Sequence, residues 1–179
     1  KKIAWYNKER ALAYEHSPYD TTILMDCDYF VFSSTLLELS KTKFDVLLHD
    51  KVNDITGQGM ILGNDESTLP LVWATVTLFR KSPNTKAIFD LIKHIQEYYP
   101  HYKNLYRIKF ANYRNDYAFA IALHQLNLGN TIPSPMGMLA DDVDVIESDS
   151  DGIAFKYKNK VNFTSGLDVH IMDKEWCNG

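Results

Sequence analysis

Two aspartates that directly follow an apolar segment are the residues best placed to do chemistry. Ile23, Leu24 and Met25 are followed by Asp26 and, after one further residue, by Asp28. A short apolar run of this kind is typical of a buried strand, and packing does not explain carboxylates at its end. In open α/β sheets ligands bind at the carboxyl ends of strands. Alternate residues of an extended segment share a side, so the spacing predicts that both carboxylates bind one hard divalent cation.

The residues before this strand extend the motif. Ser-Pro-Tyr-Asp at positions 17–20 leads into it, giving the form S-P-[FY]-D-x-T-hydrophobic-D-x-D. This combined pattern resembles the metal-binding acidic motif of GT-A glycosyltransferases. The resemblance implies that Asp26 and Asp28 hold Mn²⁺ or Mg²⁺ against the diphosphate of a nucleoside diphosphate sugar, with Asp26 also counted among the donor-binding residues. The alternative is that the two aspartates only cap the turn or helix that follows.

A second part of the resemblance lies near the end of the chain. In glycogenin-like retaining GT-A enzymes a closing histidine completes the metal site and is followed by glycine, lysine, proline and tryptophan. His170, Lys174 and Trp176 are similar to that ending, whereas Asp173 and Glu175 depart from it. The resemblance implies that His170 is the third metal ligand and that Lys174 contacts the diphosphate. A lone histidine on a strand can also be purely structural.

Two further pairs of residues match positions that GT-A enzymes use. Asn115 and Asp116 stand at the expected start of a helix, where the family places an acidic residue that faces the donor sugar or the acceptor. Both residues are also ordinary choices for a helix N-terminus. Lys8 and Arg10 precede the acidic motif, where the family often has a basic residue near the donor phosphates. The alternative is that both are solvated on a polar face.

The expected secondary structure alternates between strands and helices before it becomes mainly β. Ser82 and Pro83 predict the start of a long helix whose apolar stripe packs into the core. The acids at 147–151 imitate a calcium loop, but Lys158 stands where a bidentate glutamate is needed, so a hairpin turn is favoured. The expected strands are 22–25, 44–49, 69–80, 143–146, 153–157, 161–163 and 169–172, and the expected helices include 35–39, capped by Ser34, and 115–126.

These elements predict an α/β fold, and the resemblance implies a GT-A-like (Rossmann-like) mixed sheet flanked by helices with a β-rich C-terminal part. With 179 residues and 45% apolar composition, the chain suits a single domain over residues 1–179. GT-A domains normally place a nucleotide-binding strand, helix and strand before the acidic motif, but here Asp26 follows only 25 residues. We therefore expect a chain that lacks the N-terminal part of the domain, another segment that binds the base, or a short inactive relative.

Composition and charge limit the classes of partner and the cellular compartment that we expect. A net charge of −4 argues against general nucleic-acid binding, and the aromatic and basic stretch at 98–117 favours a carbohydrate acceptor instead. No run is long enough to span a membrane, and no apolar signal core is present at the start. Cys27 and Cys177 cannot form a disulfide framework. The sequence therefore predicts a cytoplasmic protein with no membrane partner.

The implied activity is metal-dependent transfer of a sugar from a nucleoside diphosphate sugar to a carbohydrate or other hydroxyl acceptor. A phosphatase of the haloacid-dehalogenase type is the main alternative, with Asp26 as nucleophile and Asp28 as acid and base. Against it, Phe30 stands where that motif has threonine or valine, and the later acidic pair at 141–142 follows a poor strand. A non-catalytic carbohydrate-binding relative of a transferase is the third hypothesis.

Overall fold

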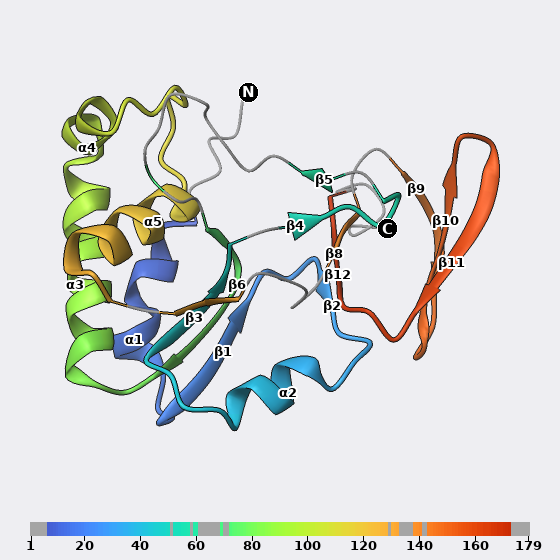
Figure 1. Ribbon diagram of the computed structural model, residues 1–179, viewed down its shortest axis with the longest axis horizontal. Helices are drawn as coiled ribbons and strands as arrows, with labels where there is room; N and C mark the ends of the chain where they lie inside the picture. Colours follow the sequence, from blue (N-terminus) through green and yellow to red (C-terminus); the bar gives the residue numbers. More distant parts are fainter. Residues whose placement is uncertain are drawn as a thin grey trace.

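A four-stranded sheet forms the centre of the computed structural model (Figure 1). Its strands lie in the order β1 (Thr21–Met25), β6 (Trp73–Arg80), β3 (Val46–His49) and β7 (Asn130–Ile132). β6 is antiparallel to both β1 and β3, and β3 is parallel to β7. β1 and β3 therefore run in the same direction, and their carboxyl ends share one edge of the sheet with the beginning of β6.

The structure describes residues 7–50, 52–57, 59–60, 69, 72–128, 130–132, 138–140 and 143–172. Within these residues the fold is mixed α/β, which confirms the expected class. Among the helices of this described part, none is long and apolar enough to cross a membrane. The expected position of Lys174 and the alternative acidic pair at 141–142 lie outside the described residues.

Helices cover the central sheet on its two faces (Figure 1). The larger core cluster joins the sheet to η1, α3, α4 and α5 through side chains such as Ala11, Ile92 and Phe119. The smaller cluster packs Leu36 of α2 against Leu47 and Leu78 on the other face. The helices are η1 (Lys8–Leu12), α1 (Ala13–His16), α2 (Thr35–Ser40), α3 (Pro83–Glu97), α4 (Tyr99–Leu105) and α5 (Asn115–Leu126).

The helix ends show which caps and bounds could be predicted from the local sequence and which could not. Ser82 caps α3 as predicted, because its Oγ accepts the backbone N–H of Thr85 at 3.1 Å. α5 has the predicted bounds and ends at Asn127 in the left-handed conformation, with φ 49°. The predicted cap of α2 was wrong: Ser34 makes no side-chain cap, and Ser33 Oγ accepts the N–H of Thr35 at 3.1 Å instead.

The stretch 98–117 contains a helix that was not among the expected elements. Residues Tyr99–Leu105 form α4, which follows α3 almost directly. The side chains of Tyr99 and Tyr102 are buried in the larger core cluster. Part of the aromatic content that suggested an acceptor surface is therefore core.

The C-terminal part is β-rich, as expected, and forms two small sheets. One contains β9 (Asp144–Ser148), β10 (Gly152–Tyr157) and β11 (Lys160–Ser165), and stands far from α3 in Figure 1. The predicted turn at Asp151 and Gly152 joins β9 to β10, and a Cβ at Gly152 would lie 1.8 Å from the carbonyl oxygen of Thr164. Only glycine fits there. A two-stranded pair is made by β4 (Val52–Asn53) and β5 (Gly59–Met60).

The other small sheet connects the end of the chain to the acidic motif. β12 (Val169–Ile171) lies between β2 (Tyr29–Phe30) and β8 (Met138–Ala140). β12 is antiparallel to β2, and His170 is opposite Tyr29. Asp168 strengthens this connection, because its Oδ1 accepts the backbone N–H groups of Phe32 and Ser33, each at 2.8 Å. His170 and Tyr29, 141 positions apart in the sequence, are thereby held side by side.

We predict that His49 makes the protein less stable in mild acid. Its side chain is fully buried, and neither ring nitrogen has a hydrogen-bond partner in the described part of the chain. Burial lowers the pKa of His49 from 6.5 to about 4. Between those two values the unfolded chain binds a proton that the folded protein does not, so stability falls as the pH drops from 6.5 to 4.

The expected loss over that interval is about 3 kcal/mol from this residue alone. Urea unfolding at a series of pH values should show a shallower dependence in His49→Phe than in the unsubstituted protein. His16→Gln, at an exposed histidine, is the matched control and should leave the slope unchanged. An identical pH dependence in His49→Phe would contradict the prediction.

Candidate metal centre

β6 leaves regular pairing with β3 at the edge of the sheet where β1 and β3 end. Leu47 is opposite Leu78, but His49, two residues farther along β3, is opposite Trp73, five residues back along β6. Extra residues in one strand form a bulge, which leaves main-chain groups unpaired and redirects side chains. The bulged residues 74–77 lie beside the end of β1, where the acidic motif begins.

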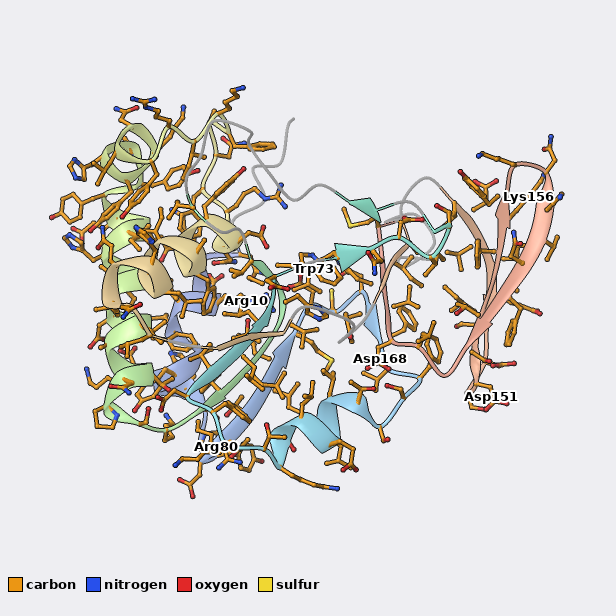
Figure 2. All side chains as sticks on the ribbon, in the orientation of Figure 1. Arg10, Trp73, Arg80, Asp151, Lys156 and Asp168 are labelled. Carbon is orange, nitrogen blue, oxygen red and sulfur yellow. The ribbon has the colours of Figure 1, made fainter. Side chains whose placement is uncertain are left out.

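A buried arginine donates to two carbonyl groups of the bulged residues. Arg10, on η1, is 5% exposed, and its guanidinium donates to the carbonyl oxygens of Ala74 and Thr75, the latter at 3.0 Å. It also forms an ion pair with Asp26 Oδ1 at 3.3 Å. Figure 2 shows Arg10 near Trp73 at the middle of the molecule. The alternative that Arg10 is solvated on a polar face does not hold.

Asp26 is held on both carboxylate oxygens. Its Oδ1 faces Arg10 and also accepts from Asn7 Nδ2 at 3.3 Å, while its Oδ2 accepts from Thr75 Oγ1 at 3.2 Å. Its backbone N–H donates to the carbonyl of Thr75 at 3.0 Å, which continues the β1–β6 ladder by one residue. The side chain remains about one-fifth exposed. Asp26 is therefore oriented by its neighbours without being sealed from solvent.

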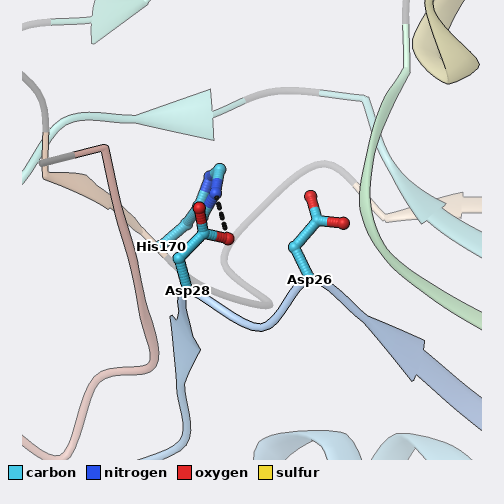
Figure 3. A group of neighbouring side chains, drawn as sticks. All are labelled: Asp26, Asp28 and His170. Atoms are coloured by element: carbon cyan, nitrogen blue, oxygen red, sulfur yellow. Dashed lines mark hydrogen bonds and ion pairs between the residues drawn. The ribbon is translucent and has the colours of Figure 1, made fainter. Parts of the chain in front are cut away.

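Asp28 and His170 are brought together by the β2–β12 pairing (Figure 3). His170 Nε2 lies 3.0 Å from Asp28 Oδ1, and both side chains are buried. The backbone of Ile171 also donates to the carbonyl of Asp28 at 2.9 Å, which fixes the two segments against each other. Trp73 packs on the imidazole of His170 with ring centroids 5.3 Å apart. The histidine is thus immobilised with one nitrogen toward the acids.

Asp26, Asp28 and His170 form a group with the composition of a divalent metal site. One ligand atom from each lies within 4.8 Å of the others. Two neighbouring ligands of an octahedral ion, each about 2.1 Å from the metal, are separated by about 3 Å, which is the Asp28 to His170 distance seen here. Carboxylates and imidazole are both common ligands of divalent ions in proteins. The residues present therefore fit a divalent cation, without selecting one ion.

Charged groups near this cluster shift the pKa values of His170 and Arg10. Burial lowers the pKa of His170, and Asp26 and Asp116 oppose that shift while Arg10 adds to it. Burial also lowers the pKa of Arg10, opposed by the same two carboxylates. The lowered pKa of His170 favours the neutral imidazole, which is the form that can bind a metal.

The two residues predicted to be catalytic lie beside this cluster. Asp116, in the first turn of α5, accepts the backbone N–H of Ala74 at 2.8 Å and pairs with Arg114 at 3.1 Å. Asn115 donates to the carbonyl of Asn7 at 3.1 Å. Neither residue caps α5 with its side chain. Their contacts connect α5 to the bulged part of β6 and to Asn7 before η1. A role only as helix-starting residues would not need these long-range contacts.

Most of the predicted site residues are therefore brought to one edge of the sheet. Lys8 is exposed on η1. Lys174 lies outside the described residues. Trp73 and Thr75 contact His170 but were missed by sequence reasoning, because they belong to an apolar strand whose bulge has no local signal.

Comparison with known proteins gives no family assignment. No family model matches the chain, and neither a curated protein nor a solved structure matches it. The chemistry of this site must therefore be inferred from its geometry.

We predict that the protein binds one Mn²⁺ and that Asp28→Asn weakens this binding at least tenfold, because an amide cannot supply the charge of a carboxylate ligand. Calorimetric titration of the metal-free protein with Mn²⁺ at pH 7.5 measures the affinity. Asp20→Asn is the matched control, since Asp20 is an exposed aspartate before the same strand. Equal affinities for the Asp28 and Asp20 variants would rule out Asp28 as a ligand.

We also predict that Arg10→Leu destabilises the fold by about 3 kcal/mol, because it removes the buried cation that is paired with Asp26 and that donates to the carbonyls of Ala74 and Thr75. Urea unfolding measures the loss. Lys8→Leu makes the same change at an exposed position of the same short helix and should cost less than about 1 kcal/mol. Similar losses in both variants would show that the buried guanidinium has no special role.

Proposed function

We propose that this chain is a GT-A-like glycosyltransferase that uses a divalent metal ion to transfer a sugar from a nucleoside diphosphate sugar to a hydroxyl acceptor. We propose as well that the central sheet is Rossmann-like and GT-A-like. Support comes from topology, because the acidic motif follows β1 at the edge where the parallel strands β1 and β3 end. Ligand sites in α/β sheets lie at such edges.

The observation that carries the proposal is the meeting of Asp26, Asp28 and His170. The D-x-D spacing alone is common by chance, and a histidine on a strand is unremarkable alone. The chain nevertheless places His170 Nε2 3.0 Å from Asp28, although 142 residues separate them. The resemblance to GT-A enzymes required this meeting of an early acidic motif with a late histidine, and a capping role for the aspartates did not.

The residues around the cluster are suited to holding a diphosphate. Asp26, Asp28 and His170 would hold Mn²⁺ or Mg²⁺, which when bound supplies positive charge against the leaving diphosphate. Arg10 balances Asp26 and so limits repulsion between neighbouring carboxylates before a ligand arrives. Because Arg10 is buried and paired, it orients Asp26 and stabilises the site's charge.

Asp116 is the candidate for contact with the sugar or the acceptor. Its Oδ1 is fixed by the N–H of Ala74, and its side chain is one-fifth exposed. A carboxylate fixed in this way can accept hydrogen bonds from sugar hydroxyls without rearranging. Arg114 beside it limits the repulsion that Asp116 would otherwise exert on a diphosphate.

The phosphatase alternative requires a different use of the same residues. Asp26 would have to direct one free oxygen at phosphorus, but both of its oxygens face protein donors. A haloacid-dehalogenase nucleophile also needs no histidine against the second aspartate. These contacts favour the transferase, and the experiment below discriminates between the two activities.

We predict that UDP or GDP, or one of their sugars, binds with detectable heat only when Mn²⁺ is present, because the ion bridges the carboxylates and the diphosphate. Calorimetry on the protein with and without Mn²⁺ tests this, and Asp28→Asn should abolish the heat. Asp20→Asn should retain it.

Other outcomes identify the alternatives. Hydrolysis of an aryl phosphate that is lost in Asp26→Asn, without nucleotide binding, would establish the phosphatase and overturn the transferase. Binding of free sugars without any nucleotide would indicate the non-catalytic carbohydrate-binding relative.

A further inference from the structure

Thr75 lies between two of the three candidate metal ligands. Its Oγ1 donates to Asp26 Oδ2 at 3.2 Å and lies 3.4 Å from Nδ1 of His170, the ring nitrogen directed away from Asp28. The side chain belongs to the bulged part of β6 and is 5% exposed. One hydroxyl thus contacts both the first aspartate and the rear of the histidine.

The protons of a neutral imidazole determine what this contact can do. An ionised carboxylate can only accept, so without a cation we place the ring proton on Nε2, 3.0 Å from Asp28 Oδ1. When Nε2 binds a cation, the single ring proton must be on Nδ1, so it leaves Nε2 for water and a proton from water joins Nδ1. The ring stays neutral, and Nδ1 becomes a donor that needs an acceptor.

A hydroxyl can serve Nδ1 in both states because it is both donor and acceptor. In the metal-free state its proton can point to Nδ1 or to Asp26. In the metal-bound state the Thr75 oxygen accepts from Nδ1–H, and its own proton points to Asp26 Oδ2. A valine of the same shape would leave a buried N–H without a partner, which is costly.

We infer that Thr75 is a positioning residue: its hydroxyl holds Nδ1 of His170, can accept from Nδ1–H in the tautomer that binds a cation through Nε2, and at the same time orients Asp26. Partners of this kind typically change metal affinity by about 10- to 100-fold when removed. The inference rests on the proposed metal-dependent function, and it adds a residue to which neither the acidic motif nor the closing histidine points.

Two pairs of variants isolate the hydroxyl. Thr75→Val removes it at constant shape, and Thr75→Ser keeps it while losing the methyl group. Thr75→Ala differs from Thr75→Ser only in the oxygen, so that pair still decides the matter if Thr75→Val does not fold. Thr77→Val is the matched control, because Thr77 is a fully buried threonine on the same strand that donates to the carbonyl of Ala74.

The first measurement is the affinity for Mn²⁺ by calorimetry at pH 7.5. Thr75→Val and Thr75→Ala should bind at least about tenfold more weakly than the unsubstituted protein. Thr75→Ser should recover most of the affinity, and Thr77→Val should retain it. Unchanged affinity in Thr75→Val and Thr75→Ala, with Mn²⁺ still bound by the unsubstituted protein, would overturn this inference and leave the proposed function intact.

The second measurement reads the tautomer directly. In long-range ¹H–¹⁵N spectra of protein labelled at histidine, one equivalent of Zn²⁺, a diamagnetic ion, should move Nδ1 of His170 from an unprotonated to a protonated chemical shift. In the metal-free protein Thr75→Val should move the Nδ1 resonance, and Thr77→Val should not. A Nδ1 that stays unprotonated with Zn²⁺ would overturn the inference. Absence of any Mn²⁺ binding in the unsubstituted protein would instead overturn the proposed function, and this inference with it.

Discussion

The bulge in β6 is the constraint on which the candidate site depends. The bulge separates the main-chain groups of Ala74 from β3, and its carbonyl accepts from Arg10 while its N–H donates to Asp116. The neighbouring carbonyl of Thr75 accepts from Arg10 and also from the N–H of Asp26. Buried main-chain groups must be paired, so the bulge draws η1 and α5 to the place where β1 ends. Asp26 follows at that place.

The second requirement is a connection between distant parts of the chain. β12 reaches the acidic motif through pairing with β2, and Asp168 adds two hydrogen bonds to the backbone after that strand. These contacts hold His170 against Asp28 without help from a ligand. A site whose ligands are already in place loses little conformational freedom when an ion binds, which favours tight binding. The same contacts stabilise the fold, so the site and the stability of the C-terminal part are coupled.

Sequence reasoning predicted the elements that local rules determine. The strand before Asp26, the Ser82 cap and the bounds of α5 were predicted from local patterns and are seen. The expected burial of that strand was wrong in part, because β1 is only partly buried and Met25 is exposed. The proximity of His170 to the acids was predicted only through a family resemblance. The burial of Arg10 and the role of Thr75 could not be predicted, because both depend on a bulge created by pairing between strands distant in sequence. The hydrogen bond from the N–H of Thr35 to Ser33 rather than to Ser34 is a smaller failure. The sequence offers two adjacent serines, and only the backbone conformation decides which hydroxyl reaches that N–H.

The central claim is that Asp28 and His170 bind the same divalent ion. Pulsed electron paramagnetic resonance of the protein with one equivalent of Mn²⁺, labelled with ¹⁵N at histidine, tests this claim most directly. The account predicts a hyperfine coupling from one directly bound imidazole nitrogen, which disappears in His170→Gln and remains in His16→Gln. Bound Mn²⁺ that shows no imidazole coupling, or the same coupling after His170 has been replaced, would contradict it.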